Sequence, residues 1–250
     1  AIVSGDVPVE GAAERIAFGK ALNAGQTCVA PDYVLCPSDR ITAFVDAFQD
    51  AMARMYPTLR DNPDYTGIIN ERQYRRLQDN LADARSKGAQ VIEINPAEEH
   101  FEDGCRKMPV TLLLNPTEDM KVMQDEIFGP LLPIVASKGL EDAMDFINRR
   151  PRPLALYYFG YDRDEQKRLL AGTHSGGVCI NDALMHVAQD DLPFGGIGDS
   201  GMGHYHGKEG FLTFSHARAV FSKQKINSGK LIYPPHGGAL HKLVYRFFIR

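Results

Sequence analysis

The sequence lacks several features that would place the protein in a specialised class. Its four cysteines form no C-x-x-C pair, and in a chain of 250 residues they are better interpreted as reduced thiols than as a disulfide framework. The longest apolar run, Leu131–Ala136, is far too short to span a bilayer. No basic segment followed by an apolar one opens the chain, so nothing supports secretion. We therefore expect a cytoplasmic protein.

Acidic residues are missing from the C-terminal part of the chain. The 28 basic and 32 acidic side chains give a net charge of −4. No Asp or Glu follows Glu209, however, and residues 210–250 carry only basic charges. The overall composition, 44% hydrophobic and 24% charged, is typical of globular proteins and excludes a disordered, collagenous or coiled-coil chain.

Helix and strand patterns alternate along the chain. Apolar positions three to four residues apart predict helices at 12–24, 41–55 (capped by Ser38), 71–87 (capped by Asn70), 140–148 and 164–170. Short apolar runs predict strands at 33–36, 90–94, 110–114, 131–136, 154–159 and 177–180. This alternation implies an α/β fold with a mainly parallel sheet flanked by helices. We predict one domain over residues 1–216 and a basic extension over 217–250.

Cys28 closes the segment Asn23–Cys28, in which a helix is predicted to end at Gly25 and a strand to follow. A loop between helix and strand can present a thiol to a cleft, where neighbouring backbone N–H groups favour charged sulfur or oxygen. The alternative is a small buried hydrophobic residue, which is what most cysteines are. Position alone favours the alternative, and does so more strongly for Cys36, Cys105 and Cys179.

The segment Asp125–Pro130 is a second candidate site. Glu126 and Phe128 put a hydrogen-bond acceptor and a flat apolar face at one turn. The acceptor could bind sugar hydroxyls, and the flat apolar face could pack against a nicotinamide or aldehyde ring. An ordinary turn before the strand is the alternative, and spacing alone favours it.

Two further patterns match functional motifs only in part. Gly196–Gly201 reads G-x-G-x-x-G, but no clear strand precedes it and no acidic residue follows about 20 residues later. We therefore predict a glycine-rich loop in close backbone contact with a neighbour, and no Rossmann fingerprint. His204 and His206 lack a third ligand at a usual spacing, so we predict loop histidines and no metal site.

The C-terminal extension predicts one amphipathic helical face. Its apolar members are Leu240, Leu243, Val244, Phe247 and Phe248, and Lys242, Arg246 and Arg250 lie on or beside the other face. Such a segment can lie on an anionic membrane, cover a sheet edge of its own chain, or dock onto a partner subunit. We rank docking within an oligomer first, which predicts a homodimer. Nothing indicates a nucleic-acid partner.

Four motifs occur in an order that resembles one known family: Gly25–Cys28, Glu126–Pro130, Ser175–Asn181 and Pro193–Gly201. Together they look like the catalytic half of an aldehyde dehydrogenase. Further segments resemble the class 3 branch of that family, and within it the bacterial enzymes that act on coniferyl aldehyde: 28–33, 202–208, 214–216 and 233–235. The resemblance covers essentially the whole chain.

The resemblance implies a role for each candidate residue. Cys28 would be the nucleophile that takes an aldehyde through a thiohemiacetal and a thioester to the carboxylic acid, with its own backbone N–H as one oxyanion donor. Glu126 would hold the nicotinamide ribose of NAD or NADP, and Phe128 would lie beside the ring. Asn181 would support the active-site region.

The sequence also departs from the family pattern. The resemblance implies an N-terminal dinucleotide-binding domain, which we expect this chain to lack, and a general-base glutamate segment that would end just before Ala1. Because the chain also starts with Ala, we expect it to be a processed or cut piece that is inactive alone. Two alternatives stay open: a catalytically incompetent oligomerisation or binding module derived from this fold, and a thiol acyl-transfer enzyme with its own histidine base.

Overall fold

A computed structural model describes residues 1–102, 104–227, 229–230 and 233–248, which divide into two compact units, 1–214 and 215–250. The strands of the larger unit are β1 (Ile2–Val3), β2 (Val34–Pro37), β3 (Gln90–Glu93), β4 (Thr111–Leu114), β5 (Leu131–Ser137), β6 (Ala155–Phe159) and β7 (Gly177–Ile180). Its helices are α1 (Val9–Ala21), α2 (Ile41–Met55), α3 (Glu71–Ser86), α4 (Lys121–Gln124), α5 (Leu140–Asn148), α6 (Arg163–Gly172) and α7 (Gly207–Thr213). Short 3-10 turns lie at Leu22–Gly25, Ser38–Arg40 and Gly198–Ser200.

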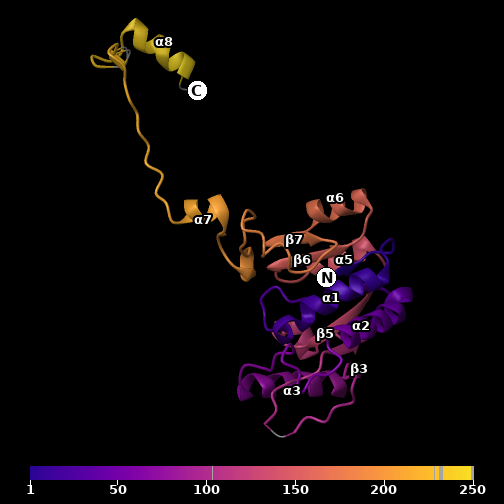
Figure 1. The fold of residues 1–250 in the computed structure, drawn as a ribbon. Coiled ribbons are helices and arrows are strands. Elements are labelled where there is room, and N and C mark those ends of the chain that lie inside the picture. Colours follow the sequence, from indigo (N-terminus) through magenta and orange to yellow (C-terminus); the bar gives the residue numbers. More distant parts are fainter. Residues whose placement is uncertain (103, 228, 231–232, 249–250) are drawn as a thin grey trace. The chain divides into compact units, whose positions relative to one another are not determined.

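Seven strands of the described residues form one sheet in the order β3-β4-β5-β2-β1-β6-β7 (Figure 1). Neighbouring strands are parallel, except that β3 runs antiparallel to β4. The predicted mainly parallel sheet is confirmed. The short strand β1 was not predicted, and it lies between β2 and β6, with Ile2 paired to both Leu35 and Tyr158.

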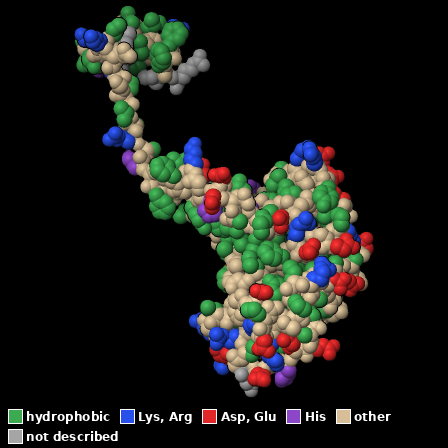
Figure 2. Space-filling view, in the orientation of Figure 1, with side chains coloured by type: hydrophobic (Ala, Val, Ile, Leu, Met, Phe, Trp, Pro, Cys, Tyr) green, Lys and Arg blue, Asp and Glu red, His purple; other side chains and the backbone are tan. Residues whose placement is uncertain are grey.

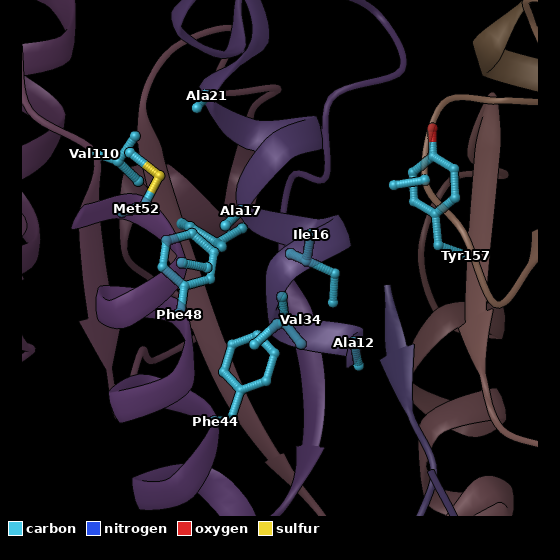
Figure 3. Close-up of a cluster of buried hydrophobic side chains, with 14 of the residues drawn as sticks. Ala12, Ile16, Ala17, Ala21, Val34, Phe44, Phe48, Met52, Val110 and Tyr157 are labelled. Carbon is cyan, nitrogen blue, oxygen red and sulfur yellow. The ribbon is translucent and has the colours of Figure 1, made fainter. Parts of the chain in front are cut away.

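Successive side chains of a strand point to opposite faces of the sheet, and both faces are covered by helices. Val34 packs in the layer that contains α1 and α2, whereas Leu35 packs with α5 and α6. Figure 3 shows the first layer, in which Phe44 and Phe48 of α2 lie against the small and aliphatic side chains of α1. Helix α3 forms a third buried cluster with β4 and β5.

Helix ends differ from the prediction where tertiary structure decides the local conformation. Helix α1 ends at Ala21, because Asn23 and Ala24 adopt left-handed φ angles of 50° and 52° in the following turn. Ser38 lies in a 3-10 turn and does not cap α2. Asn70 does cap α3, because its side chain accepts a hydrogen bond from the Gln73 N–H at 3.0 Å. The helix α7 was not predicted.

Side chains fix the segments that follow β1 and β6. Arg40 donates from its two Nη atoms to the carbonyl oxygens of Ser4 and Val7, each at 2.6 Å. Asp6 accepts hydrogen bonds from the backbone N–H groups of residues 161–162, each at 2.8 Å. The carboxyl ends of β1 and β6 are therefore held to neighbouring segments by charged side chains.

The smaller unit contains α8 (Ala239–Phe248), which includes the five apolar residues of the predicted amphipathic face. Leu240, Leu243, Phe247 and Phe248 are exposed on this helix, and Arg250 lies outside the described residues. Figure 2 shows hydrophobic, Lys and Arg side chains on the visible face of this unit. None of the helices in the described ranges combines the length and the apolar character needed to cross a membrane.

The α1–α2 layer gives a direct test of the core. Phe48 is fully buried, so Phe48→Ala should lower the free energy of unfolding by about 3–5 kcal/mol through lost apolar contacts and a residual cavity. Phe18→Ala is the matched control, because Phe18 on α1 is 38% exposed and should cost much less. Urea unfolding followed by circular dichroism measures both. Equal losses for the two variants would contradict this packing.

Candidate active site

A hollow of about 470 Å³ in the larger unit brings Cys28 and Glu126 together. Much of its wall comes from segments that precede parallel strands: Pro31–Tyr33 before β2, Gln124–Glu126 before β5, and Pro151–Leu154 before β6. The strand order β5-β2-β1-β6 places these beginnings side by side. The hollow therefore lies at the amino ends of the strands, although ligands in open α/β sheets usually bind at the carboxyl ends.

Cys28 is exposed on the turn that leads from α1 to β2. The buried alternative is thus wrong for Cys28, whereas Cys36 and Cys179 are buried as predicted and Cys105 is half-buried. The hydroxyl of Tyr157, which lies on β6, donates to the carbonyl oxygen of Val29 at 2.5 Å. This hydrogen bond anchors the turn one residue after the thiol.

Gln26 ties the same turn to the segment before α3. Its amide nitrogen donates to the carbonyl oxygens of Asn23 at 2.9 Å and Gly67 at 3.2 Å. Its amide oxygen accepts from the Ile69 N–H at 2.9 Å. Both ends of this side chain are therefore used to fix the backbone two residues before Cys28.

Gly25 brings the backbone of the cysteine turn against the glutamate turn. Its φ angle is +70°, and a Cβ atom built on it would lie 2.3 Å from the carbonyl oxygen of Gly129. Glycine alone fits this position, because any side chain would meet fixed backbone in a conformation that L-residues rarely adopt. The two predicted site segments are therefore direct neighbours.

Ile127 anchors the glutamate turn through both of its backbone polar groups. Its N–H donates to Asp32 Oδ1 at 3.1 Å, and its carbonyl oxygen accepts from Arg76 Nη2 at 2.6 Å. The flanking residues are exposed: Glu126 lines the hollow, and Phe128 has a left-handed φ of 48° and is 42% exposed. Phe128 is not among the residues that line the hollow.

Two carboxylates, those of Asp32 and Glu126, line the hollow, and the buried Lys20 lies near both. Burial lowers the pKa of Lys20 to about 8, although Asp32 and Glu126 act to raise it. Burial raises the pKa of Asp32, against the Lys20 ammonium and the Ile127 N–H, which lower it. Glu126 has a raised pKa as well, because burial of part of its carboxylate and the nearby Asp32 outweigh Lys20 and Arg76.

Four residues of this region were not predicted from the sequence: Lys20, Asp32, Arg76 and Tyr157. Lys20 carried a detectable signal, since it lies three to four residues from Ile16, Ala17 and Ala24 on the apolar face of the predicted helix. A lysine in that position indicates a buried charge. The others come from separate elements, and no pattern in the sequence joins them.

Asn181 lies outside the hollow, at the end of β7 with a left-handed φ of 57°. Its Oδ1 accepts from the Gly160 N–H at 2.9 Å, and its Nδ2 donates to the Gly160 carbonyl oxygen at 3.1 Å. Both backbone groups of Gly160 are therefore satisfied by one side chain, which fixes the segment after β6.

The glycine-rich segment 193–201 forms a loop that contributes Asp199 and Ser200 to the hollow. A Cβ atom at Gly176 would lie 2.2 Å from the Gly195 carbonyl oxygen, so the predicted close backbone contact of this loop with a neighbouring segment is confirmed. Only the isolated bridge between Phe194 and Tyr205 precedes the Gly196–Gly201 run among the described residues of this segment. The G-x-G-x-x-G run thus has no Rossmann geometry.

His204 and His206, which follow the glycine-rich loop, contact neighbouring side chains. His204 Nε2 lies 3.1 Å from Glu209 Oε2, and His206 stacks on Phe194. The described part of the chain contains no group of three or more His, Cys, Asp or Glu side chains that could hold a metal. No described histidine lines the hollow, so the structure offers Cys28 no histidine base there.

Comparison with known proteins identifies relatives of the whole chain. The model of the aldehyde dehydrogenase family matches residues 1–220. A probable coniferyl aldehyde dehydrogenase of Pseudomonas aeruginosa is 61% identical over 251 residues, which cover 100% of this chain and 52% of that protein. Aldehyde dehydrogenase family 3 member A2 of Mus musculus is 42% identical over 236 residues, which cover 92% of this chain and 46% of that protein.

A solved structure has the same fold. The substrate-bound state of Staphylococcus aureus AldH matches with a TM-score of 0.88 at 39% identity, covering 99% of this chain and 52% of that one. The chain spans about half the length of the curated relatives it matches.

The contact between the two turns can be tested at Gly25. Gly25→Ala should lower the free energy of unfolding by about 2–4 kcal/mol, because the new methyl group combines a strained φ with a clash against the Gly129 carbonyl. Gly88→Ala is the control: its φ is +95° but nothing lies within 4 Å, so only the strain of about 1–2 kcal/mol remains. Urea unfolding curves separate the two. Equal costs would mean that the turns are not in contact.

Proposed function

Because this chain belongs to the aldehyde dehydrogenase family, we propose that it is the catalytic-domain portion of an NAD(P)-dependent enzyme that oxidises an aldehyde to the carboxylic acid. The observation that carries this proposal is the hollow in which the exposed Cys28 and the Glu126 carboxylate face one space. We propose coniferyl aldehyde, or another aromatic or long-chain aldehyde, as the substrate, and the relatives named coniferyl aldehyde dehydrogenase support the first of these.

The residues present fit a nicotinamide cofactor. The Glu126 carboxylate, open at the hollow, can accept hydrogen bonds from two ribose hydroxyls. Phe128, exposed two residues later on the same turn, offers a flat apolar face to the ring. When bound, NAD or NADP supplies the hydride acceptor for the oxidation.

Cys28 would act as the nucleophile. Its thiolate sulfur forms a bond to the aldehyde carbon while the carbonyl electron pair moves to the oxygen, and the Cys28 backbone N–H donates to that oxyanion. After the two-electron oxidation the carbon remains on Cys28 as a thioester. Water then adds its oxygen to the thioester carbon and the C–S bond breaks; one proton passes to solvent, which releases the acid and returns the thiolate.

The exposed thiol can be tested by alkylation of the 250-residue chain. Iodoacetamide should modify Cys28 before the other cysteines, because Cys28 is exposed while burial raises the pKa of Cys36 to about 12 and also raises that of Cys179. Peptide mapping after short reaction times gives the order. Cys105→Ser is the control and should leave the Cys28 rate unchanged. If Cys28 reacted more slowly than the other three cysteines, the proposal that it is an accessible nucleophile would be contradicted.

We further propose that the chain alone is not catalytically competent, since the whole activity belongs to proteins about twice as long. Incubation with coniferyl aldehyde and NAD should produce no NADH above the background of a Cys28→Ser chain. The full-length Pseudomonas aeruginosa relative is the positive control. Turnover of the chain near that of the control would overturn this expectation.

Residues 217–250 are proposed to dock within a homodimer. The described part of this segment exposes the hydrophobic side chains Val220, Phe221, Ile226, Phe247 and Phe248. Exposed apolar groups of this kind favour a protein partner. Light scattering after gel filtration should give a dimer for the full chain and a monomer after deletion of 217–250. A monomeric full chain, or a deletion that stays dimeric, would contradict this role.

A further inference from the structure

Lys20 is a buried charge that the proposed mechanism does not use. Its side chain is fully buried in the last turn of α1, and its Nζ has no hydrogen-bond partner among the described residues. Moving an ammonium group out of water without giving it hydrogen bonds costs free energy unless opposite charges lie nearby. Some group around Lys20 must therefore offset this cost.

Two carboxylates from other elements provide the opposite charge. Asp32, in the segment before β2, and Glu126, in the turn before β5, are the groups that stabilise the charged form of Lys20. Arg76 on α3 also lies near this cluster. Four further charged residues line the same hollow as Glu126: Asp125, Arg150, Arg152 and Asp199. The charges around Lys20 and the two carboxylates thus come from separate parts of the larger unit.

The negative charges of Asp32 and Glu126 repel each other. Like charges close together disfavour ionisation, and Asp32 contributes, after burial, to the raised pKa of Glu126. Arg76 is already engaged, because its Nε donates to Gln73 at 2.7 Å and its Nη2 to the Ile127 carbonyl. Lys20 is the cation of this cluster whose side-chain nitrogen makes no hydrogen bond among the described residues.

We propose that Lys20 is a positioning residue whose buried ammonium neutralises the Asp32–Glu126 pair and keeps Glu126 ionised at the hollow. The role rests on the proposed function in one respect, since Glu126 must be ionised to accept hydrogen bonds from two hydroxyls of a ribose. An ionised Asp32 is likewise needed to accept strongly from the Ile127 N–H. Lys20 therefore holds both the charge and the position of the glutamate turn.

The titration of Glu126 tests this role directly. Carboxyl carbon NMR of the ¹³C-labelled chain gives its midpoint, and the resonance is assigned by its loss in Glu126→Gln. Lys20→Met keeps the length and apolar stem of the side chain but removes the charge, so the Glu126 midpoint should rise by about one pH unit. Lys20→Arg keeps the charge and should leave the midpoint near that of the parent chain.

A charge-balanced double variant separates electrostatics from packing. Adding Asp32→Asn to Lys20→Met removes one carboxylate together with the cation, so the midpoint should return towards the parent value. A packing role for Lys20 predicts no such return. An unchanged midpoint in a folded Lys20→Met chain, or no return in the double variant, would overturn the proposal.

The remaining variants keep the test decisive if Lys20→Met does not fold. Asp32→Asn alone should lower the Glu126 midpoint because it removes the neighbouring like charge, and an unchanged midpoint in that variant would count against the cluster. None of these titrations contains aldehyde or cofactor. Nicotinamide mononucleotide added to the same samples tests the ribose role separately. If the Glu126 midpoint changes with the Lys20 substitutions but the Glu126 resonance does not shift with this probe, the positioning role of Lys20 holds and the ribose site is contradicted.

Discussion

The approach of the Gly25 backbone to the Gly129 carbonyl is the constraint on which the site depends. It brings the backbone of the turn that carries Cys28 into contact with the backbone of the turn that carries Glu126. The Ile127 peptide lies beside this contact and is held from one side by Asp32 and from the other by Arg76. The thiol and the carboxylate are thus placed by backbone contacts and by side chains that do no chemistry themselves.

Burial of charge is the second principle of the site. Lys20 and Asp32 are both largely removed from bulk water, and either charge buried alone would destabilise the fold. Their mutual attraction offsets part of the free-energy cost of removing them from water. The same proximity links the first helix, the segment before β2 and the turn before β5. These three segments are therefore linked by charge as well as by packing.

Local patterns predicted the elements well where the local signal was strong. The helix at 140–148 and the strand at 177–180 have the bounds that apolar spacing indicates, and Asn70 caps its helix because an N-cap acts within one turn. The two-residue strand β1 is too short to give any periodic signal, and the antiparallel direction of β3 depends on pairing with β4. Strand direction is a property of the sheet and not of the strand.

The site was predictable only where one segment held enough information. Cys28 and Glu126 lie in short motifs whose family resemblance implies a role for each. The role of Asp32 and Arg76 in placing the glutamate turn follows only from their shared contact with Ile127 in the folded chain. The end of α1 shows the same limit, because the left-handed Asn23 and Ala24 serve the approach to Gly129 and oppose the helical preference of the sequence.

The clamps at the carboxyl ends of β1 and β6 have an evolutionary consequence. Arg40, Asp6 and Asn181 secure the edge of the sheet opposite the hollow, using hydrogen bonds to backbone groups. One edge thus preserves the scaffold, while loops at the other edge line the hollow that contains Cys28 and Glu126. Substitutions in those loops would leave the clamping hydrogen bonds in place, so the lining of the hollow can vary while the fold is retained.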